Sequence, residues 1–132
     1  MNSFDPRTLA KPVYESLCQL RAQTRDPERL KEQKNQAVEL YTYLSTWGLL
    51  RLKAEEDALS QEGKKEVVKE FFDCLEKISG QNEIAKSNGL DRLMGLGVEE
   101  YLGLTGLGLA LAQEFSFWAT AIYHDDDVSG GD

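Results

Sequence analysis

The C-terminal quarter of the chain restricts the possible fold more than any other segment. From Val98 to Tyr123 the sequence reads VEEYLGLTGLGLALAQEFSFWATAIY and contains no Lys or Arg. Apolar residues that recur every three or four positions line one face of a helix. This segment is therefore predicted to be the long core helix of an all-α protein. Its apolar seam consists of Tyr101, Leu104, Leu107 or Gly108, Leu111, Phe115, Trp118 and Ile122.

Three glycines interrupt this predicted helix, at Gly103, Gly106 and Gly108. Each costs about 1 kcal/mol relative to Ala in a helix interior. We expect the cost to be offset by close approach of a neighbouring helix, or avoided because the helix begins later, near Leu107. Asp125–Asp127 would oppose the helix dipole, so the helix is expected to end by about His124.

Helix signals dominate the rest of the chain. Asp5-Pro6 and Asp26-Pro27 each place an N-cap residue before a proline at the first helical position. Gly48 is a weak point in the second helix, and Gly80 is a natural C-cap for the third. The expected helices cover Pro6–Gln23, Pro27 to as far as Leu59, Lys64–Ser79 and Leu90–Met94, with a turn at Gln61–Lys65 and a polar loop at Gln81–Gly89.

These signals predict an all-α bundle of four or five helices with a long C-terminal core helix. At 132 residues the chain is long enough for one domain with a real core. We expect a single helical domain over residues 1–124, followed by a disordered acidic tail over residues 125–132.

Compartment and solubility follow from three observations. The N-terminal sequence MNSFDPRTLAKP has no apolar region like that of a signal peptide. Glu114 lies near the middle of the long apolar segment, where a charge would be costly in a bilayer. Cys18 and Cys74 are far apart and match no disulfide or zinc spacing, so both are expected to be reduced packing residues. We predict a soluble cytoplasmic protein without a membrane span.

The net charge of −8 is unevenly distributed. Residues 1–92 hold all 15 Lys and Arg against 16 Asp and Glu, whereas residues 93–132 hold seven acidic residues and no basic one. The overall negative charge argues against nonspecific nucleic-acid binding. A local basic face on the first two thirds of the chain is still compatible with this net charge. Candidate phosphate-binding residues in that part are Arg21, Arg25, Arg29, Lys31, Lys34, Arg51 and Lys53. Interleaved acids such as Asp26, Glu28 and Glu32 favour ordinary surface ion pairs instead.

Aromatic residues offer a second kind of contact, because aromatic rings can stack on bases. At helical spacing they belong more often to the core. Tyr43 and Phe117 fall off the main apolar seams, and Glu114 is the only charge deep inside the C-terminal segment. These three residues are candidates for contact with a protein partner.

Catalytic and metal-binding motifs are weak. His124 precedes three aspartates, but consecutive residues on a flexible tail diverge rather than converge on an ion. No strained turn presents a serine for a Ser-His-Asp arrangement, and the paired acids at Glu55–Asp57 and Glu99–Glu100 fall in polar stretches. The glycines at 95–108 are not followed by the Lys-Ser/Thr of a phosphate loop. We predict a binding protein with no cofactor and no metal.

Three stretches together resemble a known family. They are YTYLSTWGLLRLKAEED (residues 41–57), KKEVVKEFFDCLEKI (64–78) and EEYLGLTGLGLALAQEFSFWATAIY (99–123). The order is a helix with a GLxxxL-like stretch, a Lys-rich amphipathic helix, and a closing helix with a Tyr-x-x-x-Thr pattern and a Trp. This order is similar to the small helical subunit of type III CRISPR effector complexes, and most similar to the III-B form.

The resemblance implies a non-enzymatic subunit that stacks in a filament beside the crRNA–target duplex. Basic residues of the first two helices would line the nucleic-acid channel, and acidic and apolar surfaces would meet neighbouring protein subunits. The closing helix of the family usually carries basic residues near its end, and here it has none. Contact with RNA or single-stranded nucleic acid is therefore expected through the first half of the chain.

Two other classes of function remain open. The first is a small acidic helical adaptor or inhibitor that binds a basic protein partner by imitating nucleic acid. It predicts that the acids after Met94 cluster on one exposed face. The second is a metal-dependent bundle hydrolase that uses carboxylates.

Overall fold

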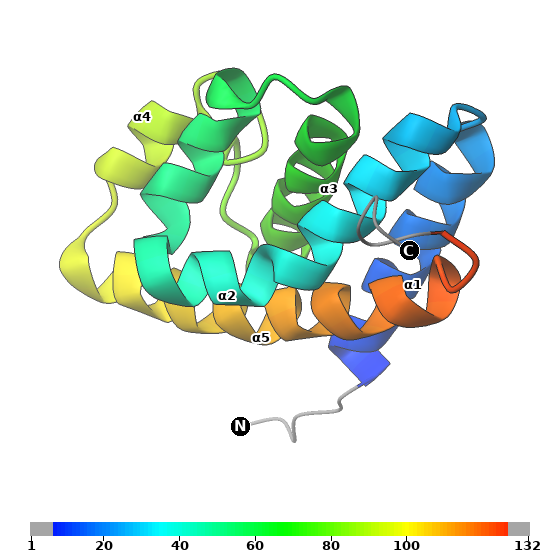
Figure 1. Ribbon diagram of the computed structural model, residues 1–132. Coiled ribbons are helices and arrows are strands. Elements are labelled where there is room, and N and C mark those ends of the chain that lie inside the picture. Colours follow the sequence, from blue (N-terminus) through cyan, green and yellow to red (C-terminus); the bar gives the residue numbers. More distant parts are fainter. Residues whose placement is uncertain (1–6, 127–132) are drawn as a thin grey trace.

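The computed structural model describes residues 7–126, and these form an all-α bundle of five helices (Figure 1). No strand occurs within that range. The prediction of an all-α bundle with a long C-terminal helix is confirmed. The helices are α1 (Arg7–Gln23), α2 (Pro27–Ala58), α3 (Glu62–Ser79), α4 (Gly89–Met94) and α5 (Val98–Ile122).

Helix α5 is the element on which the larger helices assemble. It runs along one side of the bundle and contacts α1, α2 and α3 (Figure 1). Its buried residues are Leu104, Gly108, Leu111, Ala112, Phe115 and Ala119. At the centre, the Phe71 ring meets Phe72 and Phe115 edge to face, with centroid distances of 5.2 and 5.7 Å. Such pairs add to the burial of apolar area, which is the main stabilising contribution here.

The predicted helix signals are present where the structure describes them. The Asp26 side chain caps α2 by accepting a hydrogen bond of 3.1 Å from the Glu28 amide. Gly80 caps α3 with φ of 77°, in the left-handed region that favours glycine. The α1 residues Leu9, Val13, Leu17 and Leu20 are all buried, and the helix continues through Pro12. The N-cap predicted at Asp5 lies outside the described residues.

Two sequence-based expectations are wrong. The turn at Gln61–Lys65 is instead the start of α3, which begins at Glu62. Gly63 lies inside this first turn because α3 approaches α2 closely there: a Cβ at Gly63 would be 2.5 Å from the Arg29 carbonyl oxygen. The second expectation, close approach of a helix at the α5 glycines, is confirmed at Gly108 and wrong at Gly103 and Gly106, and α5 begins at Val98 rather than near Leu107. Only Gly108 faces a neighbouring helix, whereas a Cβ at Gly103 or Gly106 would meet nothing within 4 Å.

The residues directly after α5 pack onto the bundle, and the prediction of a disordered tail is wrong at Asp126. Helix α5 ends at Ile122, near the predicted end, and Tyr123 is completely buried. Asp126, from the predicted disordered tail, accepts a hydrogen bond of 3.1 Å from Arg21 Nε. The remaining tail, residues 127–132, lies outside the described residues. No helix within residues 7–126 combines the length and the apolar character needed to cross a membrane.

Candidate functional site

Helix α2 contains a sharp bend at Gly48, and this bend positions the most distinctive surface of the protein (Figure 1). Gly48 has φ of 88° and ψ of 173°, which a residue with a Cβ rarely adopts. A Cβ there would meet no atom within 4 Å, so the position requires glycine for its backbone conformation and not for lack of space. A break in a helix leaves amides without helical acceptors. The Leu50 amide donates instead to the Tyr101 hydroxyl on α5, at 3.2 Å.

The elbow surface, which we define as Tyr43, Trp47 and Arg51, lies on the two sides of this bend. Trp47 is 52% exposed, and the Arg51 guanidinium lies over its ring at 4.5 Å from the centroid. Tyr43 precedes Trp47 by one turn and is half-buried. Burial and the nearby Glu55 carboxylate raise the pKa of Tyr43, while Arg51 lowers it. An exposed indole beside a guanidinium offers a stacking platform with a positive charge, as used for unpaired bases.

Four of the seven predicted phosphate-binding residues have side chains that bind other residues of the chain. Arg21 binds the Asp126 carboxylate, and Lys34 donates to the Asp126 backbone carbonyl. Arg29 pairs with Glu66 on α3. Lys53 is buried, with its Nζ 2.8 Å from Glu56 and 5.1 Å from the centroid of the Phe72 ring. These side chains hold the helices together.

The other three residues do not form one patch. Arg25 is exposed before the start of α2, Lys31 is half-buried one turn into it, and Arg51 follows the bend. A rise of 1.5 Å per residue separates Arg25 from the bend by roughly 30 Å. The structure therefore brings Arg51 together with the aromatic residues Tyr43 and Trp47, and places Arg25 and Lys31 at the other end of the first arm of α2.

The predicted protein-contact residues also lie apart. Phe117 is 60% exposed and meets Trp118 edge to face at 5.0 Å, and Trp118 meets Tyr14 at 5.4 Å. Glu114 accepts a hydrogen bond of 3.0 Å from Trp118 Nε1 and thereby orients that ring. Phe117 and Glu114 thus belong to an aromatic group at the C-terminal end of α5, whereas Tyr43 belongs to the elbow surface.

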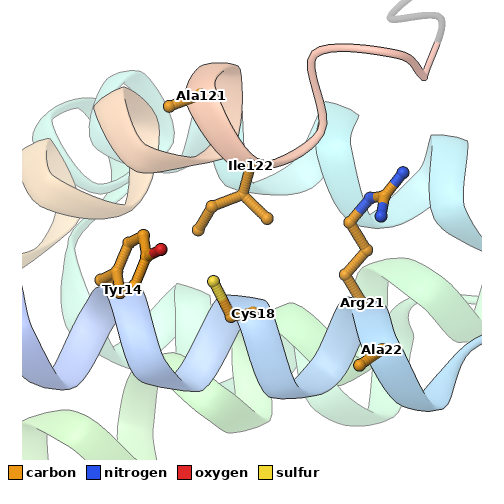
Figure 2. Close-up of a pocket in the computed structure, with 6 residues that line it drawn as sticks. All are labelled: Tyr14, Cys18, Arg21, Ala22, Ala121 and Ile122. Carbon is orange, nitrogen blue, oxygen red and sulfur yellow. The ribbon is translucent and has the colours of Figure 1, made fainter.

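Figure 2 shows a hollow of about 450 Å³ between α1 and the end of α5. Tyr14, Cys18 and Arg21 line it from one face of α1, and Ile122 lies opposite the Cys18 thiol. That thiol raises the pKa of Tyr14. Arg21 is already paired with Asp126, so its charge is not available to an anion in this hollow without breaking that pair.

The predicted alternatives gain little from the geometry. His124 Nε2 lies 3.3 Å from Asp125, but Asp126 faces Arg21 instead, and Asp127 is outside the described residues. Across residues 7–126 no three His, Cys, Asp or Glu side chains are grouped as a metal site would require. The acids after Met94 are also dispersed. Glu99 and Glu100 open α5, and Asp125 follows its end, about 37 Å away along a helix of 25 residues.

Sequence reasoning missed a buried polar network around Gln33. The Gln33 amide donates to Thr24 Oγ1 and Glu66 Oε1, both at 2.9 Å, and its carbonyl accepts from Tyr123. One signal was available: Gln33 precedes Ala37, Leu40 and Leu44 at spacings of four, three and four, so it occupies the buried stripe of α2.

Comparisons with known proteins add no further constraint, because no family model, curated protein or solved structure significantly matches the chain.

Proposed function

We propose that this chain is a non-catalytic small subunit of a type III CRISPR ribonucleoprotein effector complex, of the III-B-like kind. One observation supports the proposal above others. The residues that carry the family resemblance contact one another: Tyr101, which opens the Tyr-x-x-x-Thr pattern, accepts the hydrogen bond of the Leu50 amide in the GLxxxL-like stretch. Thr105 closes that pattern by donating to the Tyr101 carbonyl at 2.8 Å.

The contact continues deeper into the core. A Cβ at Gly108 would be 3.3 Å from Leu49 Cδ2 and 3.5 Å from Leu44 Cδ2, so α5 and the two arms of α2 are packed closely at this point. Short apolar patterns recur by chance in helical proteins. Here the two patterns form one packed unit, in which Leu50 and Tyr101 are 51 residues apart in the sequence.

The elbow surface is the part of the chain best suited to nucleic acid. It lies within residues 1–92, whose charge is close to balanced. Trp47 offers a ring for a base, and Arg51 supplies a charge for a neighbouring phosphate. Because stacking on a ring and contact with a phosphate do not distinguish the bases, we expect contact with RNA or single-stranded nucleic acid that is largely independent of sequence.

The first test is assembly. A type III-B effector complex from the same organism, prepared without its small subunit, is mixed with this chain and examined by native mass spectrometry. We expect one or more copies to join the complex stoichiometrically. A chain that is folded by circular dichroism and yet does not join would refute the proposal.

The second test addresses the nucleic-acid contact. Affinity for a fluorescent single-stranded RNA is measured by anisotropy, with the chain alone and in the complex. Removing a stacking ring costs about 1–3 kcal/mol per base, so Trp47→Ala should weaken binding at least fivefold, and Arg51→Glu should do likewise. Lys69→Glu on α3 is the matched control, because Lys69 is exposed and carries the same charge. Equal losses of RNA affinity for Lys69→Glu and Arg51→Glu would show that binding depends on the net charge of the chain and not on the elbow surface.

A further inference from the structure

Three of the six large apolar side chains that are exposed within residues 7–126 gather in one groove. They are Met94, Val98 and Leu102, with 62%, 76% and 63% of their surface exposed. The α4–α5 groove, as we call it, has a volume of about 320 Å³ and is completed by Leu50, Leu93, Leu96 and Tyr101. Isolated apolar residues are common on protein surfaces, but a lined groove of them marks a binding surface.

The groove has a fixed floor. Tyr101 is held by the Leu50 amide at the bend of α2, and Leu93 is buried in the core. Helix α4 is only six residues long, and its contact with α2 stabilises it. A preformed apolar groove binds a partner without the entropic cost of ordering it first.

The neighbouring face of α5 is acidic. Glu99 and Glu100 lie beside the exposed Gly103, in a second hollow of about 280 Å³ against the end of α3. The two carboxylates lie at the N-terminus of α5, whose partial positive charge stabilises them, and the C-terminal end of α3 beside them carries partial negative charge.

Nearby basic residues leave this charge unpaired. Arg92 donates to the Asn82 carbonyl and to Gln81 Oε1, and not to either glutamate. Lys77 lines a different hollow, against α1. Residues 93–126 contain no Lys or Arg. The surface around the first two turns of α5 therefore combines an apolar groove with two glutamates that form no ion pair with a Lys or Arg side chain within residues 7–126.

We infer that the α4–α5 groove is the docking site for a basic amphipathic helix of a protein partner. Val98 and Leu102 are four residues apart and so form one ridge on the surface of α5, against which a second helix can pack. Apolar side chains of the incoming helix would fill the groove, and a Lys or Arg on its flank would reach Glu99 and Glu100. This inference does not require the proposed function. If that function holds, the partner is a neighbouring protein subunit.

Charge also argues against a second copy of this chain as the occupant. A two-fold symmetric contact places the same patch on both sides of the interface. Two grooves facing each other would place four glutamates, two from each copy, around one interface, and like charges at an interface are unfavourable.

The test uses a synthetic helical peptide of Leu and Lys, with a stripe of Leu at i, i+3, i+4 and i+7, titrated into the full chain. We expect saturable binding, with NMR amide shifts concentrated at Met94, Val98 and Leu102. Leu102→Ser should weaken binding about tenfold, the usual effect of removing a central apolar anchor. Glu99→Gln with Glu100→Gln should weaken it severalfold and reduce its salt dependence. Glutamine can replace Glu100 in accepting the hydrogen bond of the Gly97 amide that caps α5.

Two controls make the outcome decisive. Phe117→Ser removes an equally exposed apolar side chain from the other end of α5 and should leave the affinity unchanged. A peptide with Glu in place of Lys should not bind. Equal effects of Phe117→Ser and Leu102→Ser, or binding without saturation, would show nonspecific attraction and overturn the inference. A dimer of the chain that Leu102→Ser dissociates would also overturn it, by assigning the groove to a second copy. RNA binding through the elbow surface should be unaffected by Leu102→Ser, so the two proposals fail separately.

Discussion

The hydroxyl of Tyr123 donates a hydrogen bond of 2.7 Å to the side-chain carbonyl of Gln33, 90 residues earlier in the chain. Both side chains are completely buried, and Gln33 connects onward to Thr24 before α2 and to Glu66 on α3. The Arg21 guanidinium lies 5.8 Å from the centroid of the Tyr123 ring. One pair and its neighbours thus join the end of α5 to α1, α2 and α3.

We expect Tyr123→Phe to lower the free energy of unfolding by about 1–3 kcal/mol, because it leaves the Gln33 carbonyl buried without its donor. Urea unfolding followed by circular dichroism measures the change. Tyr41→Phe is the control: Tyr41 is half-buried, and its hydroxyl has no hydrogen bond within residues 7–126. Similar losses for both variants would mean that the Tyr123 hydroxyl has no special role.

Stability should fall at alkaline pH through the same residue. Burial raises the pKa of Tyr123 well above its ordinary value of 10.0, so the folded state keeps the proton that the unfolded state releases. The contribution of Tyr123 to the free energy of unfolding is therefore complete below about pH 10. It is lost as the pH rises toward the pKa of Tyr123 in the folded state. One group gives a slope of at most about 1.4 kcal/mol per pH unit. Unfolding free energies between pH 8 and 11.5 should decrease less steeply for Tyr123→Phe, and parallel curves would contradict the assignment.

The two cysteines should differ in reactivity. Burial raises the pKa of the Cys74 thiol to about 11, whereas the Cys18 thiol lines the hollow between α1 and α5. The thiolate is the reactive form. At pH 8 we expect N-ethylmaleimide to modify Cys18 first and Cys74 only after unfolding, as determined by peptide mass spectrometry. Equal rates for the two thiols in the folded protein would rule out this burial of Cys74.

Glycine substitutions in the two long helices should have opposite effects. Gly48→Ala should destabilise by about 1–2 kcal/mol, since φ of 88° is unfavourable for any residue with a Cβ. Gly106→Ala should stabilise by roughly 0.8–1 kcal/mol, because Gly106 is exposed inside α5 with open space around it. Thermal melts of both variants test the pair. Destabilisation by Gly106→Ala would indicate that α5 is not a regular helix at that point.

Gly48→Ala should also weaken the proposed contact with RNA. A changed bend would move Trp47 relative to Arg51, so Gly48→Ala is expected to weaken RNA binding as much as Trp47→Ala does. Gly106→Ala, which lies away from the bend, serves as the control for a helix glycine. Unchanged RNA affinity in Gly48→Ala would show that the proposed RNA contact does not depend on the bend.

Local signals in the sequence were sufficient for most of the helix boundaries. Asp26-Pro27 starts α2, Gly80 ends α3, and the apolar spacing of α1 identifies its buried face, because caps and periodicity act within a few residues. The start of α3 was different. The segment QEGKK, residues 61–65, has the composition of a turn. Only the close packing of Gly63 against the Arg29 carbonyl explains a glycine inside the helix.

The sequence by itself thus determined the helical class, the order of the helices and the position of the weak point at Gly48. Tertiary structure decided which charges remain available. The sequence predicts Lys34 and Arg21 as phosphate-binding residues, but both bind Asp126, 92 and 105 residues away. It also decided that Gly103 and Gly106 face outward while Gly108 faces α2. Such outcomes depend on contacts between distant segments, which spacing along one helix does not encode.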